Sequence, residues 1–92
     1  MLYTWGEAKR LTNLAKHGLY VADAERVLAG PLVIFEDRSA GYQEQRLIGM
    51  GLLDLLFVLI VHVEQDDTIR IISMRKADRY ETELFYRNAG YF

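Results

Sequence analysis

The sequence predicts an α+β domain with two N-terminal helices, a four-stranded and mainly antiparallel sheet, and a C-terminal helix. Three observations lead to this prediction. Apolar residues recur at helical spacing near both ends of the chain, extended apolar segments fill the middle, and short turn-forming segments separate them. The chain has 92 residues, 51% of them hydrophobic, which suits one domain spanning residues 1–92 and leaves no room for two.

The first helix is predicted over residues 5–17, with Gly18 as the glycine that ends it. Its apolar residues at helical spacing are Ala8, Leu11, Leu14 and Ala15. The polar residues Lys9, Asn13 and Lys16 fall on the opposite side of the helix. We therefore expect one side of this helix to face the core and the other side to be basic.

A second helix is predicted over residues 21–28 and would form a helical hairpin with the first. Gly30 and Pro31 then break the helical pattern, and extended segments follow. The four predicted strands cover residues 32–36, 45–50, 55–62 and 68–74. Turns are expected at residues 37–41, 51–54 and 66–67. Residues 76–86 return to helical spacing, and Gly90 is placed to end this last helix.

The third predicted strand contains an apolar run. Residues 55–61 are all apolar, which predicts a strand in the middle of the sheet with both of its faces covered. Helices can cover one face, whereas a chain of this size has little left for the other. We expect the last helix or a partner protein to supply that cover.

Composition excludes several classes of site. The sequence has no cysteine, so disulfides, thiolate metal sites and a cysteine nucleophile are excluded. His17 and His62 lack HxxxH spacing, so a zinc site has no support and we expect no cofactor. His62 is expected to be a core or edge histidine rather than a ligand. No signal peptide is evident, and residues 52–63 are too short for a membrane helix. We therefore expect a cytoplasmic protein without a membrane partner.

The formal net charge of -2 conceals an uneven distribution. Residues 9–17 and residues 70–79 each carry +3, which leaves -8 for the rest of the chain. A basic patch on an acidic protein still attracts a polyanion at short range. We expect the two basic segments to meet on one surface; the alternative is that both are ordinary solvated faces.

Three groups of residues follow one another along the chain in a recognisable order. The first is Trp5, Lys9, Asn13 and the run Lys16-His17-Gly18; the second is Glu44, Arg46 and Gly49; the third is the run Arg70-Ile71-Ile72-Ser73 with Arg75, Ala77 and Glu81. In this order and spacing they resemble the BrnT toxins, members of the RelE-like superfamily. Gly6 and Met74 depart from the pattern, since the family often has Asp and Ala there, but neither position obviously carries chemistry.

The resemblance implies a RelE-like toxin of a type II toxin-antitoxin pair that cleaves RNA without a metal ion. It also implies a BrnA-like antitoxin with a ribbon-helix-helix part, so that operator DNA is bound only through the antitoxin. The toxin would assemble as a homodimer or as a heterotetramer with that antitoxin. The alternative function is a non-catalytic binding module of the same fold that docks an antitoxin or a nucleic acid.

Candidate catalytic residues lie in the last predicted strand. Metal-independent RNA cleavage uses the 2′-hydroxyl as nucleophile, so the protein must supply a base and cations for the phosphate. Strand alternation places Ser73 and Arg75 on one face with Ile71, and Arg70 on the other face with Met74, unless the strand bulges. Arg75 would hold a phosphate with both arms of its guanidinium while Ser73 donates a hydroxyl hydrogen bond.

Two glutamates are candidates for proton transfer. Glu81 falls between apolar side chains on its helix, so we expect partial burial that raises its pKa and suits a general base. Glu44 and Arg46 share strand parity and would form a second acid-base element or an exposed ion pair. The alternative for both glutamates is structural pairing with the arginines, Arg46, Arg70 or Arg75.

A further set of residues is expected to contact RNA. Lys9, Lys16 and Lys76 would attract its backbone. Tyr80 would stack on an exposed base. His17 would act as an acid or base near neutral pH, or would cap the free carbonyls at the end of its helix, and we favour capping.

Overall fold

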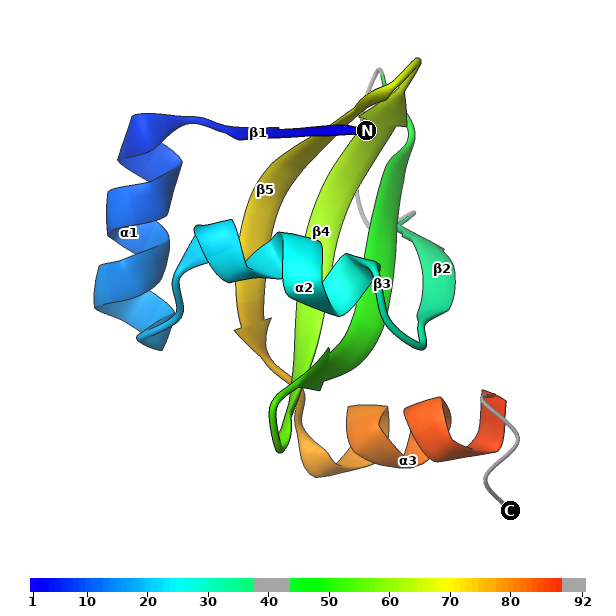
Figure 1. Cartoon of the computed structure of the whole chain (residues 1–92). Helices are drawn as coiled ribbons and strands as arrows, with labels where there is room; N and C mark the ends of the chain where they lie inside the picture. Colours follow the sequence, from blue (N-terminus) through cyan, green and yellow to red (C-terminus); the bar gives the residue numbers. More distant parts are fainter. Residues whose placement is uncertain (38–43, 89–92) are drawn as a thin grey trace.

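The computed structural model describes residues 1–37 and 44–88. Within these ranges it has three α-helices and a five-stranded mixed sheet with the strand order β1-β5-β4-β3-β2 (Figure 1). The strands are β1 (Leu2–Trp5), β2 (Val33–Asp37), β3 (Arg46–Leu53), β4 (Leu56–Gln65) and β5 (Thr68–Lys76). The helices are α1 (Glu7–His17), α2 (Ala24–Leu28), which directly follows the 3-10 turn Val21–Asp23, and α3 (Arg79–Asn88). No helix in these ranges is long and apolar enough to cross a membrane.

The α+β prediction is confirmed, and the four predicted strands correspond to β2 through β5, which pair antiparallel. The prediction of a sheet with four strands is wrong, because β1 adds a fifth that runs parallel to β5. Trp5, paired with Ile71, therefore ends a strand instead of beginning a helix. The sequence does not reveal β1, because four residues are too few to show an alternating pattern and because its partner strand lies far along the chain.

Other predicted boundaries shift as well. The second predicted helix is divided, since residues 21–23 form a 3-10 turn and only Ala24–Leu28 is α-helical. Leu55, predicted to begin a strand, is 98% exposed in the turn before β4, next to Asp54 with its positive φ of 55°. Most of the predicted turn at 37–41 and the helix-ending Gly90 fall outside the described residues.

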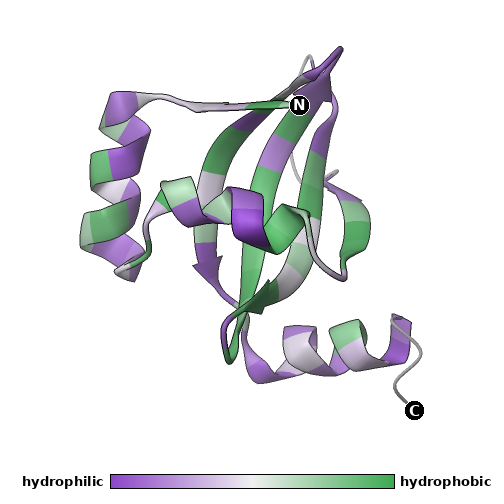
Figure 2. Cartoon of the chain, in the orientation of Figure 1, coloured by the Kyte–Doolittle hydropathy of each residue, from purple (hydrophilic) through white to green (hydrophobic). Residues whose placement is uncertain are grey.

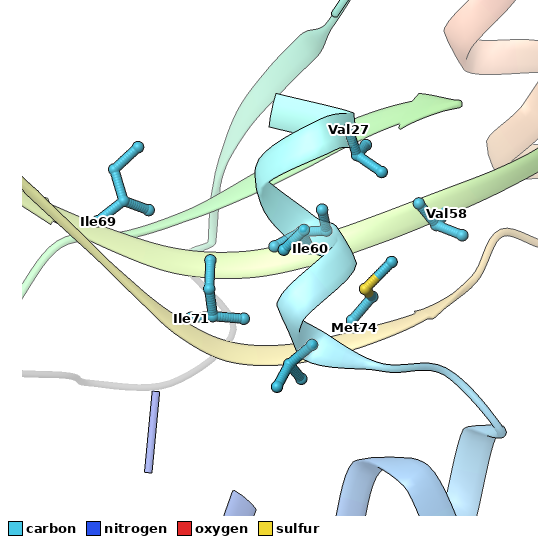
Figure 3. Close-up of a cluster of buried hydrophobic side chains, with 8 residues drawn as sticks. Val27, Val58, Ile60, Ile69, Ile71 and Met74 are labelled. Atoms are coloured by element: carbon cyan, nitrogen blue, oxygen red, sulfur yellow. The ribbon is translucent and has the colours of Figure 1, made fainter. Parts of the chain in front are cut away.

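α2 covers one face of the sheet (Figure 1). Val27 of this helix packs in a cluster with residues of β4 and β5 that are almost completely buried: Val58, Ile60, Ile71 and Met74 (Figure 3). Gly49 on β3 allows the close approach of α2, because a Cβ at this position would lie 2.9 Å from Cδ2 of Leu28. The glycine of the second motif therefore serves packing.

α3 packs at one end of the opposite face. Its buried Phe85 contacts Leu59 of β4, whose side chain alternates with those of the first cluster. The ring of Phe57 lies 5.1 Å from that of Phe85. The expectation that the last helix covers the second face is therefore confirmed for this end of the sheet. Figure 2 shows the hydrophobic turn between β3 and β4 close to α3.

A β-bulge in β5 changes which side chains share a face. Val61 of β4 is paired with Ser73, but the next residue, His62, is paired with Ile71, so Ile72 is the extra residue. As a result Ile71 and Met74 both point into the cluster beneath α2. The expectation that Ile71 shares a face with Ser73 is therefore wrong, because simple alternation holds only without the bulge.

Candidate functional site

α1 lies beside the part of β5 that β1 leaves unpaired. β1 pairs with β5 only as far as Ile71, after which the chain turns into α1, and this helix runs along the remaining edge (Figure 1). Asn13 joins the two elements: its Oδ1 accepts a hydrogen bond of 2.8 Å from the backbone N–H of Met74. Its Nδ2 donates to the carbonyl oxygen of Leu19 at 3.2 Å. A single side chain thus satisfies an edge N–H of the sheet and fixes the chain after α1.

This geometry corrects the predicted orientation of α1. Asn13 was expected on the basic side, opposite the core, yet only 4% of it is exposed, whereas Leu11, expected in the core, is 53% exposed. The side of the helix that carries Asn13 faces β5, because the side-chain amide of Asn13 takes the place of a missing strand partner. Figure 2 shows hydrophilic and hydrophobic segments alternating along this helix.

A groove of about 440 Å³ lies between α1 and β5. It is lined by Ala8, Lys9, Thr12, Asn13, Lys16, His17, Ile72 and Ser73. Among residues 1–37 and 44–88, no acidic residue belongs to this lining. Among the described residues, the side chains of Lys9, Lys16 and His17 have no hydrogen-bond or ion-pair partner. The groove is therefore a concentration of positive charge that nothing in the described part of the chain neutralises.

His17 does not cap its helix as expected. The C-terminus of α1 is closed by Gly18, which adopts the left-handed conformation (φ 68°) and donates its N–H to the carbonyl oxygen of Leu14 at 2.9 Å. The imidazole of His17 is left half-buried in the groove wall.

The two basic segments of the sequence adjoin at this groove, but only the first contributes basic side chains to it. Residues 9–17 contribute both lysines and the histidine, whereas residues 70–79 contribute Ile72 and Ser73. Arg75 and Lys76 do not belong to the lining, and Lys76 instead pairs with Val58 at the end of β5. Tyr80 is 68% exposed on α3 and is not part of the lining either.

The other candidate residues lie on the sheet face away from α2. Arg75 is in register with Leu59, which packs against α3, and it forms a two-pronged ion pair with Glu81 of that helix. Its Nη1 and Nη2 donate to Oε1 and Oε2 at 2.9 and 2.7 Å. The side chain of Glu81 is 19% exposed and that of Arg75 is 45% exposed. The predicted structural pairing of these two residues is confirmed.

Glu81 is also held by the start of its own helix. It accepts a hydrogen bond from the N–H of Asp78 at 2.9 Å, while Asp78 Oδ1 accepts one from the N–H of Glu81 at 2.8 Å. This reciprocal pair is a capping box, and the spacing Asp78-x-x-Glu81 could have predicted it. The hydrogen bond from Arg75, opposed by burial and supported by the N–H of Asp78, holds the pKa of Glu81 below its usual value. The expected rise in pKa is therefore wrong.

Arg70 and Glu44 form the second ion pair of this face. Both side chains are partly exposed, and they lie near a smaller hollow lined by Arg70 and residues of β1, β4 and β5. Glu44 is therefore the partner of Arg70, and Arg46 lies opposite Asp37 on β2.

His62 is completely buried, as expected for a core histidine. Its Nδ1 lies 3.1 Å from the carbonyl oxygen of Ile60, and its Nε2 lies 3.3 Å from Oε1 of Glu64. Across residues 1–37 and 44–88, no three His, Asp or Glu side chains gather where they could hold a metal ion.

Comparison with known proteins gives one family. Residues 5–81 match the model of a family described as "Ribonuclease toxin, BrnT, of type II toxin-antitoxin system". This match includes all of α1 and β5, and it ends at Glu81. No curated protein matches the chain.

Proposed function

The chain belongs to the BrnT family of ribonuclease toxins of type II toxin-antitoxin systems, and from this premise we propose that it is an endoribonuclease that cleaves RNA without a metal ion. The groove between α1 and β5 would bind the RNA backbone. Lys9 and Lys16 would contact phosphates, and Ser73 would donate a hydroxyl hydrogen bond to the phosphate that reacts.

The observation that carries this proposal is that the cationic side chains of the groove are not paired with carboxylates among the described residues. Lys9, Lys16 and His17 line one concave surface without an acidic neighbour in the lining and without a partner among the described residues. A cation already paired with a carboxylate must give up that pair to bind phosphate, whereas these side chains have no such pair to break. The acidic net charge of the whole chain does not oppose this role, because screening limits distant charges to about 8–10 Å.

Cleavage by the 2′-hydroxyl places negative charge on a crowded phosphate. Cations fixed around that phosphate stabilise the transition state, and this is why the lysines support a mechanism that needs no metal ion. Arg75 and Arg70 would add positive charge from the neighbouring sheet face. Each would first have to leave its glutamate; Glu81 would then still be held by the N–H of Asp78.

The partner would be a BrnA-like antitoxin with a ribbon-helix-helix part, which would bind operator DNA and neutralise the toxin by covering the groove. The complex would be a heterotetramer, or the toxin would form a homodimer. Size-exclusion chromatography with light scattering of the toxin alone and with the protein encoded beside it tests this assembly.

The direct test is cleavage of a synthetic single-stranded RNA by the purified protein in EDTA. We expect products ending in 2′,3′-cyclic phosphate and 5′-hydroxyl groups, and no cleavage when every ribose is 2′-deoxy. The variant Lys9→Gln should cut more slowly, while Arg10→Gln should cut at the wild-type rate because Arg10 pairs with Glu7 and does not line the groove. Dependence of the wild-type activity on added Mg²⁺ would contradict metal independence.

A non-catalytic binding module is the second candidate. The observation that favours it is that Arg70 and Arg75, the strongest phosphate ligands on the sheet face, are both neutralised by glutamates. Such a module would bind its antitoxin and RNA without cutting the RNA, and its expression alone would not stop growth. Growth arrest that disappears in the Lys9→Gln variant would exclude this candidate.

A further inference from the structure

RNA cleavage by the 2′-hydroxyl requires a group that removes its proton, and the structure leaves few side chains that can do so. Glu81 is bound by Arg75 through both oxygens and by the N–H of Asp78, so three of its roughly four lone-pair sites are occupied. Glu44 is paired with Arg70. Neither carboxylate lines the groove that holds the unpaired cations.

Within the described part of the chain, the groove lining contains one side chain able to accept a proton near neutral pH. Lysine ammonium groups can only donate, and the amide oxygen of Asn13 already accepts the N–H of Met74. The hydroxyls of Thr12 and Ser73 are not bases at this pH. The remaining polar group is the imidazole of His17, and histidine ordinarily exchanges a proton between about pH 5 and 8.

The position of His17 suits this task. It is the last residue of α1, and Gly18 rather than His17 closes the helix, so the imidazole is not used for capping. Across the groove, β5 presents Ile72 and the Ser73 hydroxyl, neither of them charged. The charged groups that share the lining with His17 are Lys9 and Lys16, both on its own helix.

We propose that His17 is the general base of RNA cleavage. Its neutral imidazole takes the proton of the ribose 2′-hydroxyl as the 2′-oxygen attacks the adjacent phosphorus. The P–O2′ bond forms, the P–O5′ bond breaks, and the leaving 5′-oxygen takes a proton from water or from a groove ammonium. The products are a 2′,3′-cyclic phosphate and a 5′-hydroxyl, and no oxidation or reduction occurs. This inference rests on the proposed ribonuclease function.

The test compares wild type, His17→Gln and His17→Ala on the same RNA between pH 5 and 9. Wild-type kcat/KM should rise with pH through the histidine range and then level off. His17→Gln should lose about 100- to 10,000-fold in rate and lose this rise, because glutamine can hydrogen-bond but cannot take up a proton. Binding of an all-2′-deoxy analogue, measured by fluorescence anisotropy, should change less than about threefold, since the lysines remain.

Added imidazole distinguishes a catalytic from a purely structural role of His17, because it can restore the cleavage rate only if the imidazole itself transfers the proton. It should restore part of the rate of His17→Ala, which has room for it, and should leave Lys9→Gln unchanged. Thermal melting of each variant establishes that it is folded.

The outcomes separate the two proposals. Cleavage by His17→Gln at the wild-type rate and with the wild-type pH profile overturns the assignment of His17 while the ribonuclease function stands. A slow His17→Gln that keeps the rising pH profile, or a His17→Ala that imidazole does not rescue, also overturns it. No cleavage by the wild type overturns the proposed function itself.

Discussion

The groove between α1 and β5 and the sheet face beyond it each carry positive charge, but in opposite states. In the groove, Lys9 and Lys16 have no acidic partner among the described residues. On the sheet face, Arg70 is held by Glu44 and Arg75 by Glu81. Judged from the sequence alone, the cationic motif residues of both regions are equally suited to binding phosphate. The difference between them arises from which glutamates the fold brings within reach.

This contrast separates residues that hold the fold together from residues available to a ligand. The pair of Arg75 and Glu81 fastens β5 to the start of α3, and Glu81 also forms the capping box of that helix with Asp78. The groove lysines make no such link. Substitutions in the two regions should therefore affect different measurements, stability on the sheet face and RNA affinity in the groove.

The largest effect is expected where the groove is joined to the sheet. Asn13→Ala would remove the acceptor of the buried N–H of Met74 and the donor to Leu19. An unsatisfied buried N–H costs about 1–3 kcal/mol, so the free energy of unfolding should fall by about 2–3 kcal/mol. Urea denaturation measures this loss. Thr12→Ala, a neighbouring substitution in the groove wall, should change it by less than about 0.5 kcal/mol.

If Asn13→Ala proves as stable as Thr12→Ala, the amide does not bridge helix and strand, and the two walls of the groove are held by other contacts.

Removal of the groove charge is expected to have the next largest effect. The double variant Lys9→Gln with Lys16→Gln should weaken RNA binding roughly 10- to 30-fold, from about 1 kcal/mol for each contact. The slope of log affinity against log salt should become shallower by about 1.4, or 0.7 for each lost contact with a single strand. Fluorescence anisotropy at several salt concentrations measures both. The matched control is Arg10→Gln, whose side chain pairs with Glu7.

An equal loss of affinity in Arg10→Gln would mean that general charge, and not the groove, attracts RNA.

Glu81→Gln is expected to have smaller effects, which differ in direction for RNA affinity and for stability. Glutamine keeps an oxygen that can accept the N–H of Asp78 but no longer neutralises Arg75, so RNA affinity should rise by up to about fivefold while stability falls by up to about 1 kcal/mol. The pKa of Glu81 is lowered in the folded protein, so its stabilising effect is present at neutral pH and is lost as the pH falls below 4.5. Urea denaturation at several pH values should therefore show wild type and variant converging in acid.

A difference in stability that stays constant from pH 7 to pH 3 would contradict the charge-based account of this pair.

The smallest effect is expected for Glu44→Gln. Its pair with Arg70 is exposed on both sides, so the change in the free energy of unfolding should be at most about 0.5 kcal/mol. If Arg70 contacts RNA, affinity should rise by up to about twofold in the anisotropy assay. A fall in affinity would show that Glu44 itself, rather than the released arginine, supports RNA binding.

The sequence predicted the elements whose patterns are local. Helical spacing and apolar runs located α1, the strands β2 to β5 and α3. The pattern could not reveal β1, because a four-residue edge strand pairs with residues more than sixty positions away. It also could not reveal the bulge at Ile72, which becomes visible only in the register of β5 against β4.

Prediction of the site failed for a related reason. Asn13 was placed on the basic side, opposite the core, because of its helical spacing with Lys9 and Lys16, but it accepts the backbone N–H of Met74 in a distant strand. The pairing of Glu81 with Arg75 was foreseen as an alternative, and the capping box beside it could have been read from Asp78 and Glu81. That Lys9, Lys16, His17 and Ser73 share one groove depends on the meeting of α1 and β5, which no local pattern encodes.

The distance along the chain between the groove walls has a consequence during synthesis. α1 is complete after His17, whereas β5 begins only at Thr68, and the hydrogen bond between Asn13 and Met74 spans 61 positions. A ribosome extends the chain by about 5–20 residues each second, so the α1 segment waits several seconds for the strand that it must contact. A chain terminated before Thr68 keeps both groove lysines and His17 but has no opposite wall. The complete groove is therefore among the last features of this protein to form.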